Sequence, residues 1–102
     1  MILARVFSNI YREGGIILVD SKGLKYICGN PRKDNPITVK LLKENLSWKL
    51  ILDPELEFPE AYMRNEIVIE NASLKEFLMD LVKNLGRREV TSASYISKRI
   101  FQ

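Results

Sequence analysis

Apolar residues recur at helical spacing near both ends of the first 86 positions. In the first eleven residues they fall in pairs four positions apart, and two glycines stop the run, which predicts a short amphipathic helix. Further along, Ser73 and Glu76 have the spacing of a capping box and open a Leu-rich segment that Gly86 closes. This second segment predicts the clearest helix of the chain.

Four further segments carry the apolar pattern of strands. Residues 16–19 and 24–28 flank a turn that begins at Asp20, so we expect them to pair as a hairpin. Residues 37–41 alternate apolar and polar side chains, and in residues 66–70 Ile67 and Ile69 alternate with Glu66, Val68 and Glu70, which indicates two more strands. This mixture of helices and strands predicts an α+β fold.

Two shorter helical segments are expected between the third and fourth strands. The first is capped by Asn45 and ends at Asp53, because the residue before a proline is disfavoured in a helix. The second is a helical turn that starts at Pro59, where a proline is tolerated, and stops at Asn65 in a left-handed conformation.

Composition and size fit one small domain. The chain has 102 residues, 46% of them hydrophobic, and one cysteine, so it can build a core but not an internal disulfide. The longest unbroken apolar run covers residues 16–19, far fewer than the roughly 20 residues that span a bilayer. We therefore expect a cytoplasmic location, with a peripheral position at the inner membrane as the alternative.

Charge is ordered basic, acidic, basic along the sequence. Residues 1–49 hold nine basic and four acidic side chains, residues 50–86 hold three and eight, and residues 87–102 hold four and one. Such an order can present a cationic face to anionic phospholipid, to nucleic acid or to an acidic partner. The alternative is a set of charges scattered over a solvated surface, since blocks in the sequence need not become patches in space.

No pattern in the sequence indicates a catalytic, cofactor-binding or metal-binding site in this chain. The chain contains no histidine, which excludes Ser-His-Asp and Cys-His nucleophilic sites and every metal site that uses imidazole. We interpret the carboxylates from Asp53 to Glu60 as exposed residues at helix starts rather than as an acid/base pair, and Cys28 as a buried structural thiol. We therefore predict no catalytic, cofactor-binding or metal-binding residue.

One stretch of the sequence resembles a known family. From Leu52 to Glu70 the chain reads LDPELEFPEAYMRNEIVIE and leads into the Leu-rich helical segment. This stretch resembles the N-terminal domain of bacterial cyclopropane-fatty-acyl-phospholipid synthases, and the resemblance covers about residues 1–86. The family usually has glycine where Pro59 and Asn65 stand here, and both residues are conformationally acceptable substitutes.

The resemblance implies both a fold and a role. The fold is sterol-carrier-protein-like: a small, twisted, mainly antiparallel sheet of about four to five strands packed against helices around an apolar cavity. The enzymes of this family are S-adenosylmethionine-dependent methyltransferases that act on phospholipid chains, and their catalytic domain with its cofactor loop matches no position here. Residues 1–86 would then be a non-catalytic, lipid-binding-like domain, and residues 87–102 a basic tail or a linker toward a catalytic domain.

Two sets of residues are candidates for a role in lipid binding. The first set consists of large apolar side chains that could form a pocket wall, although each taken alone fits an ordinary core: Trp48, Phe58, Tyr62, Met63, Phe77 and Leu81. The second set consists of basic side chains that could face a membrane or simply be solvated: Arg5, Arg12, Lys22, Lys25, Arg32 and Lys33.

The expected partners are a phospholipid or an anionic membrane surface, and a methyltransferase domain in the same chain or a separate one. The alternative function is a protein–protein interaction or oligomerisation module without a lipid ligand, in which a sheet edge or the basic tail binds a partner or a second copy as a homodimer. Nucleic acid is not expected as a partner, because aromatic residues do not interleave with the basic ones as stacking platforms.

Overall fold

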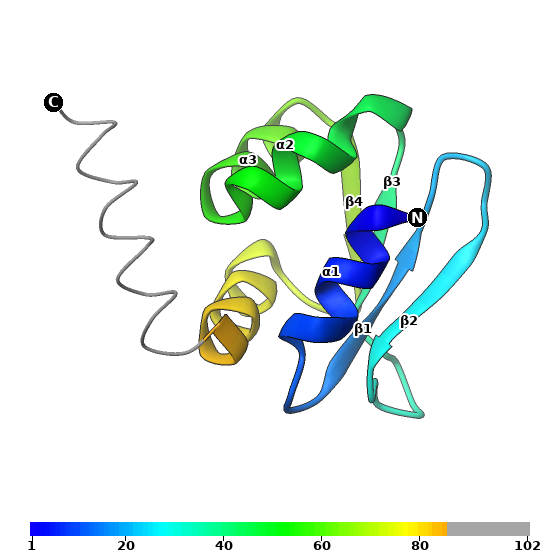
Figure 1. Ribbon diagram of the computed structural model, residues 1–102, viewed down its shortest axis with the longest axis vertical. Helices are drawn as coiled ribbons and strands as arrows, with labels where there is room; N and C mark the ends of the chain where they lie inside the picture. Colours follow the sequence, from blue (N-terminus) through cyan, green and yellow to red (C-terminus); the bar gives the residue numbers. More distant parts are fainter. Residues whose placement is uncertain (86–102) are drawn as a thin grey trace, which may run out of the picture.

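A four-stranded sheet and the helices that pack on it make up the described part of the protein (Figure 1). The computed structural model describes residues 1–85. The predictions that concern Gly86 and the basic tail of residues 87–102 lie outside the described residues. Within the described part, the predicted α+β fold is confirmed.

The helices broadly follow the sequence pattern. The two clearest predictions, an amphipathic first helix and a Leu-rich helix opened by Ser73, are both confirmed. The helical segments are α1 (Ile2–Ile10), the short 3-10 helix η1 (Glu44–Leu46), α2 (Ser47–Leu52), α3 (Pro54–Met63) and a helix over residues 74–85.

The two short helices between the third and fourth strands begin at other residues than predicted. Asn45 lies inside η1, and Leu46 is the N-cap of α2, so the predicted cap at Asn45 is wrong. The helix α3 begins at Pro54, and Pro59 lies inside it. Pro54 already occupies the first-turn position that a proline favours, so Pro59 did not mark the start. The predicted left-handed stop at Asn65 is confirmed by its φ of 59°.

The sheet contains all four predicted strands, in the order β2-β1-β3-β4. Its central pair, β1 and β3, is parallel, whereas β1 with β2 and β3 with β4 are antiparallel. The sheet is therefore mixed, and its edges are β2 and β4. The strands are β1 (Gly15–Val19), β2 (Lys25–Gly29), β3 (Thr38–Leu41) and β4 (Ile67–Glu70).

The turn between β1 and β2 is held by one carboxylate. The Asp20 side chain accepts hydrogen bonds from the backbone N–H groups of Lys22 and Leu24, both at 2.9 Å, and from the Tyr26 hydroxyl at 3.2 Å. Desolvation alone would raise the pKa of Asp20, but these hydrogen bonds outweigh it and hold the pKa below its ordinary value. The predicted hairpin therefore has a fixed turn.

Three aromatic rings form the centre of the core, between the sheet and the helices. Phe7 lies with its ring centroid 5.7 Å from that of Phe58, and Phe58 meets Phe77 edge to face at 5.0 Å. All three rings are fully buried. They come from α1, α3 and the helix over residues 74–85, so the ring contacts join three helices above the sheet.

The connection between α1 and β1 is tied to the last described helix. The side-chain oxygen of Asn84 accepts hydrogen bonds from the backbone N–H groups of Arg12 at 2.9 Å and Glu13 at 2.8 Å. Beside it, the Glu13 carboxylate lies 3.1 Å from the ammonium of Lys83. These contacts tie the loop after α1 to the last described helix.

Candidate functional site

The six lipid-pocket candidates separate into two groups. Three of them are fully buried in the core: Phe58, Phe77 and Leu81. The other three lie at the surface: Trp48, Tyr62 and Met63. None of the six lines either of the two pockets described next. The structure thus places three of the candidates in the core and three at the surface.

Two open pockets are formed by described residues. The larger one has a volume of about 630 Å³ and lies between the start of β1 and the helix over residues 74–85, with Ile37 and Met79 among its apolar walls and Arg32 among its polar ones. The smaller one has a volume of about 360 Å³ and lies beside the β1–β2 turn, lined by Lys22 and Leu24 among others. Both are depressions of the surface rather than enclosed cavities.

A carboxylate of the larger pocket is already engaged in the fold. Glu76 accepts a hydrogen bond from the backbone N–H of Ser73 at 3.0 Å, and the Ser73 hydroxyl accepts one from the N–H of Glu76 at 3.1 Å. This is the predicted capping box. The hydrogen bond from the Ser73 backbone is the main reason that the pKa of Glu76 lies below its ordinary value.

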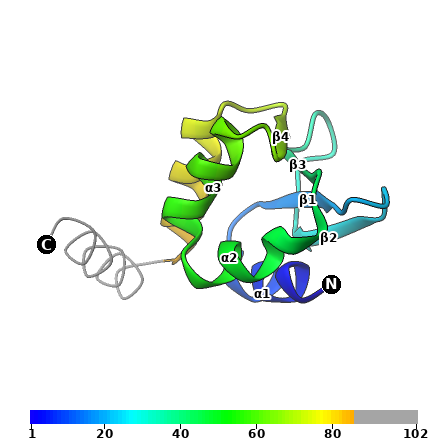
Figure 2. The same ribbon diagram turned by 90° about the horizontal axis from the view of Figure 1, so that it is seen from above.

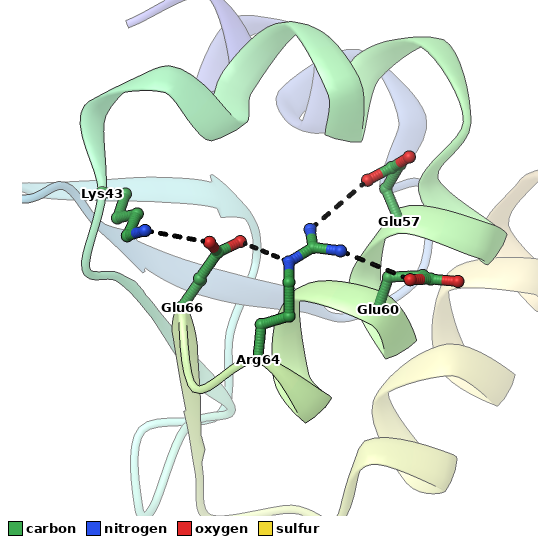
Figure 3. Close-up of polar contacts among 5 residues, drawn as sticks. All are labelled: Lys43, Glu57, Glu60, Arg64 and Glu66. Atoms are coloured by element: carbon green, nitrogen blue, oxygen red, sulfur yellow. Dashed lines mark hydrogen bonds and ion pairs between the residues drawn. The ribbon is translucent and has the colours of Figure 1, made fainter.

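Several carboxylates of the acidic segment, residues 50–86, surround Arg64 of the same segment (Figure 3). The Arg64 guanidinium lies 3.0 Å from the Glu66 carboxylate, 3.3 Å from Glu60 and 3.8 Å from Glu57. The ammonium of Lys43 approaches Glu66 at 3.1 Å from the other side. The hydrogen bond from Arg64, followed by the one from Lys43, lowers the pKa of Glu66. These carboxylates are thus engaged in ion pairs.

The six basic candidates differ from these paired cations. All six are exposed, and none forms an ion pair with another residue between 1 and 85. Arg32 is a special case, because it donates a hydrogen bond to the Asn35 carbonyl and its charge helps to lower the pKa of Glu76. The cations that do form pairs in the described part are Lys40, Lys43, Arg64 and Lys83.

The sheet face opposite the helices is open in the described part of the chain (Figure 2). In the sheet register Ile27 of β2 stands beside Ile17 of β1, and Lys40 of β3 stands beside Val68 of β4. Ile27 is 70% exposed. Glu70 lies on the same face as Val68 and pairs with Lys40 at 3.2 Å, so this face mixes aliphatic, basic and acidic side chains. The sequence pattern had indicated only that one face of the fourth strand could be wet.

Between residues 1 and 85, no three His, Cys, Asp or Glu side chains gather in a way that could hold a metal ion. Cys28 is buried, and this burial raises the pKa of its thiol. In the same part of the chain, no helix has the length and apolar character needed to cross a membrane.

Comparisons of the chain with models of protein families, with curated proteins and with solved structures give no match.

Proposed function

We propose that this chain is a non-catalytic membrane-docking module that holds a methyltransferase of the cyclopropane-fatty-acyl-phospholipid synthase kind at a phospholipid surface. The resemblance of residues 52–70 to the N-terminal domain of those enzymes supports the choice of this kind of enzyme. S-adenosylmethionine would be bound by the methyltransferase domain and not by these residues.

The observation that carries the proposal is the way charges are paired. Five carboxylates are engaged in ion pairs within the described part, whereas the exposed basic candidates between Arg5 and Lys33 have no carboxylate partner there. A cation near an anionic lipid surface contributes about 1 kcal/mol of binding free energy. Several such cations on a chain with a net charge of +3 favour an anionic surface as the partner. The carboxylates in ion pairs are Glu13, Glu57, Glu60, Glu66 and Glu70.

The core favours docking over the enclosure of an acyl chain. Phe58 and Phe77, which would line an internal lipid cavity, are in ring contact with each other and have no exposed surface. Trp48 and Met63, from the same set of candidates, are 63% and 80% exposed. The candidates are thus divided between core and surface, and the buried rings stabilise the fold.

Vesicle flotation tests the proposed function. The full chain is mixed with vesicles of phosphatidylcholine alone, or of phosphatidylcholine with phosphatidylglycerol as the anionic lipid, and centrifuged through a density gradient. We expect the protein to float with the anionic vesicles and to remain at the bottom with the neutral ones. Equal recovery with both vesicle types, or no binding to either, would contradict a docking role.

A second candidate function is an interaction module without a lipid ligand. Two observations favour it: β2 and β4 are edge strands, and the face of the sheet opposite the helices is open in the described part. Edge strands and open faces are surfaces on which proteins associate. Light scattering of the purified chain tests this function, because self-association through such a surface gives the mass of a dimer at micromolar concentration.

A further inference from the structure

The second half of the β1–β2 hairpin lies in a segment without acidic side chains. Between residues 21 and 33 the sequence holds four basic residues and no Asp or Glu. The carboxylate that precedes this segment, Asp20, is occupied by three hydrogen bonds inside the turn. Lys22 and Lys25 are exposed and have no ion-pair partner among residues 1–85. Residues 15–29, which form the hairpin, therefore carry two basic side chains and one carboxylate, a net charge of +1.

The same hairpin exposes two large aliphatic side chains between its cations. Leu24, directly before β2, is 57% exposed, and Ile27 within it is 70% exposed. They point to opposite faces of the hairpin, since they are three positions apart in extended backbone. β2 is an edge strand, so no other strand of the sheet covers its outer side. A flat surface that approaches this side can contact side chains on both faces of the hairpin. We call Lys22, Leu24, Lys25 and Ile27 the hairpin surface.

The hairpin surface is accessible and has a fixed shape. In both views the hairpin projects from the body on the side away from α3 and from the helix over residues 74–85 (Figures 1 and 2). The hydrogen bonds to Asp20 hold its turn in one conformation. A surface that is already ordered loses less conformational entropy on binding.

The outer face of α2 is the competing apolar surface. Trp48 and Leu52 lie four positions apart and are both exposed. Lys49 stands between them, but the carboxylate of Asp53 directly follows this short helix, whereas Glu44 before it lines the pocket beside the hairpin turn together with Lys22 and Leu24. Carboxylates near an anionic surface oppose binding. Charge therefore favours the hairpin surface over α2.

We propose that the hairpin surface is the part of this protein that docks on an anionic phospholipid bilayer. Leu24 and Ile27 enter the headgroup region, and Lys22 and Lys25 meet the lipid phosphates. This inference rests on the proposed docking function and names the surface that performs it. An interfacial site of this kind gains affinity from buried apolar area and from electrostatic attraction to anionic lipid together.

The test compares the affinities of variants of the full chain for vesicles of phosphatidylcholine with phosphatidylglycerol. Neutralising both cations in Lys22→Gln/Lys25→Gln is expected to weaken binding about 30-fold, because each contributes about fivefold. Ile27→Ser is expected to weaken it about fivefold, and Leu24→Ser serves as a second apolar variant. The matched controls are Lys75→Gln for the charge and Trp48→Ser for the apolar side chain, and both are expected to bind within twofold of the parent chain.

The outcomes separate the two proposals. If the parent chain does not bind anionic vesicles, the docking function fails and the hairpin proposal with it. If the parent chain binds and the hairpin variants bind equally well, docking stands and the hairpin proposal is overturned. Loss of binding in Trp48→Ser alone would assign the contact to α2 and also overturn it. Circular dichroism of each variant ensures that folded proteins are compared, and the substituted side chains are all exposed.

Discussion

Phe58 and Phe77 meet edge to face with ring centroids 5.0 Å apart, in the space between sheet and helices. A sterol-carrier-like fold would hold its apolar cavity in that space. Edge-to-face contact between buried rings stabilises a core beyond the area that the rings bury. The contact therefore supports a structural role for two residues that the sequence offered as a lipid-pocket wall.

The ring contact predicts a large loss of stability when it is removed. Phe58→Ala is expected to lower the free energy of unfolding by about 3–5 kcal/mol, because it leaves a cavity beside two other rings. Urea denaturation followed by circular dichroism measures the change. The milder Phe58→Leu keeps the protein folded if the first variant does not fold, and it is expected to cost about 1 kcal/mol.

The control for this experiment is Met63→Ala. Met63 belongs to the same set of sequence candidates but is 80% exposed. Its replacement is expected to change the free energy of unfolding by less than about 0.5 kcal/mol. Equal losses for Phe58 and Met63 would show that Phe58 does not occupy the centre of the core.

Asn84 is expected to be important for the position of the loop after α1. Asn84→Ala removes the acceptor for the N–H groups of Arg12 and Glu13, and each lost hydrogen bond costs about 0.5–1.5 kcal/mol. The amide protons of these two residues should exchange faster with solvent, which nuclear magnetic resonance measures. Lys83→Ala removes only an exposed ion pair and should leave both exchange rates nearly unchanged. Unchanged exchange rates in Asn84→Ala would show that the hydrogen bonds to Asn84 do not form.

The ion pairs of Glu66 predict how stability depends on pH. The pKa of this carboxyl lies below its ordinary value of 4.5 because of hydrogen bonds from Arg64 and Lys43. A lowered pKa in the folded state means that the carboxylate stabilises the fold above pH 4.5, and that this contribution is lost as the pH falls through the folded-state pKa. Urea denaturation at several pH values should show the loss.

The variant Glu66→Gln isolates this contribution. It is expected to be less stable than the parent chain at pH 7 and to approach it below pH 4.5, because the parent then loses its charge. A constant difference in stability from pH 7 to pH 2.5 would show that the charge of Glu66 is not involved. Glu60→Gln is the matched control, since its ion pair with Arg64 is exposed on both sides, and it is expected to change the pH profile little.

Vesicle binding is expected to weaken with salt. Raising the concentration of sodium chloride from 0.1 M to 0.5 M shortens the Debye length from about 10 Å to about 4 Å. Contacts of Lys22 and Lys25 with lipid phosphates lose most of their long-range attraction under these conditions. Flotation with anionic vesicles should therefore fall at the higher concentration, and binding that is insensitive to salt would contradict a cationic docking surface.

Much of the fold follows from local signals in the sequence. The capping box at Ser73, the turn at Asp20 and the left-handed Asn65 each require particular residues at particular positions, and each is confirmed. The start of α3 was missed because two prolines, Pro54 and Pro59, both suit the first turn of a helix. The parallel pairing of β1 with β3 depends on contacts between distant segments, which periodicity does not report.

The sequence pattern did not predict which apolar side chains are exposed. Leu46 and Leu50 are buried, while Trp48 and Leu52 are exposed. Both pairs have a spacing of four residues, so the sequence gives no reason to place one pair inside rather than the other. The exposure of Ile27 was equally hidden, because an aliphatic residue in a strand fits a covered face as well as an open one. In contrast, the exposure of the basic candidates followed from their charge.

A fluorescent probe at position 27 tests the hairpin proposal most directly. Ile27→Cys is labelled with an environment-sensitive nitrobenzoxadiazole dye. Cys28 should take no label, because it is buried and the pKa of its thiol is raised. The parent chain, treated with the dye in parallel, checks this. Lys75→Cys, on the helix over residues 74–85, carries the same dye as the control. With vesicles that contain phosphatidylglycerol, we expect the emission at position 27 to shift to the blue and gain intensity, while the emission at position 75 stays unchanged. Unchanged emission at position 27 on protein that floats with the vesicles would contradict the proposal.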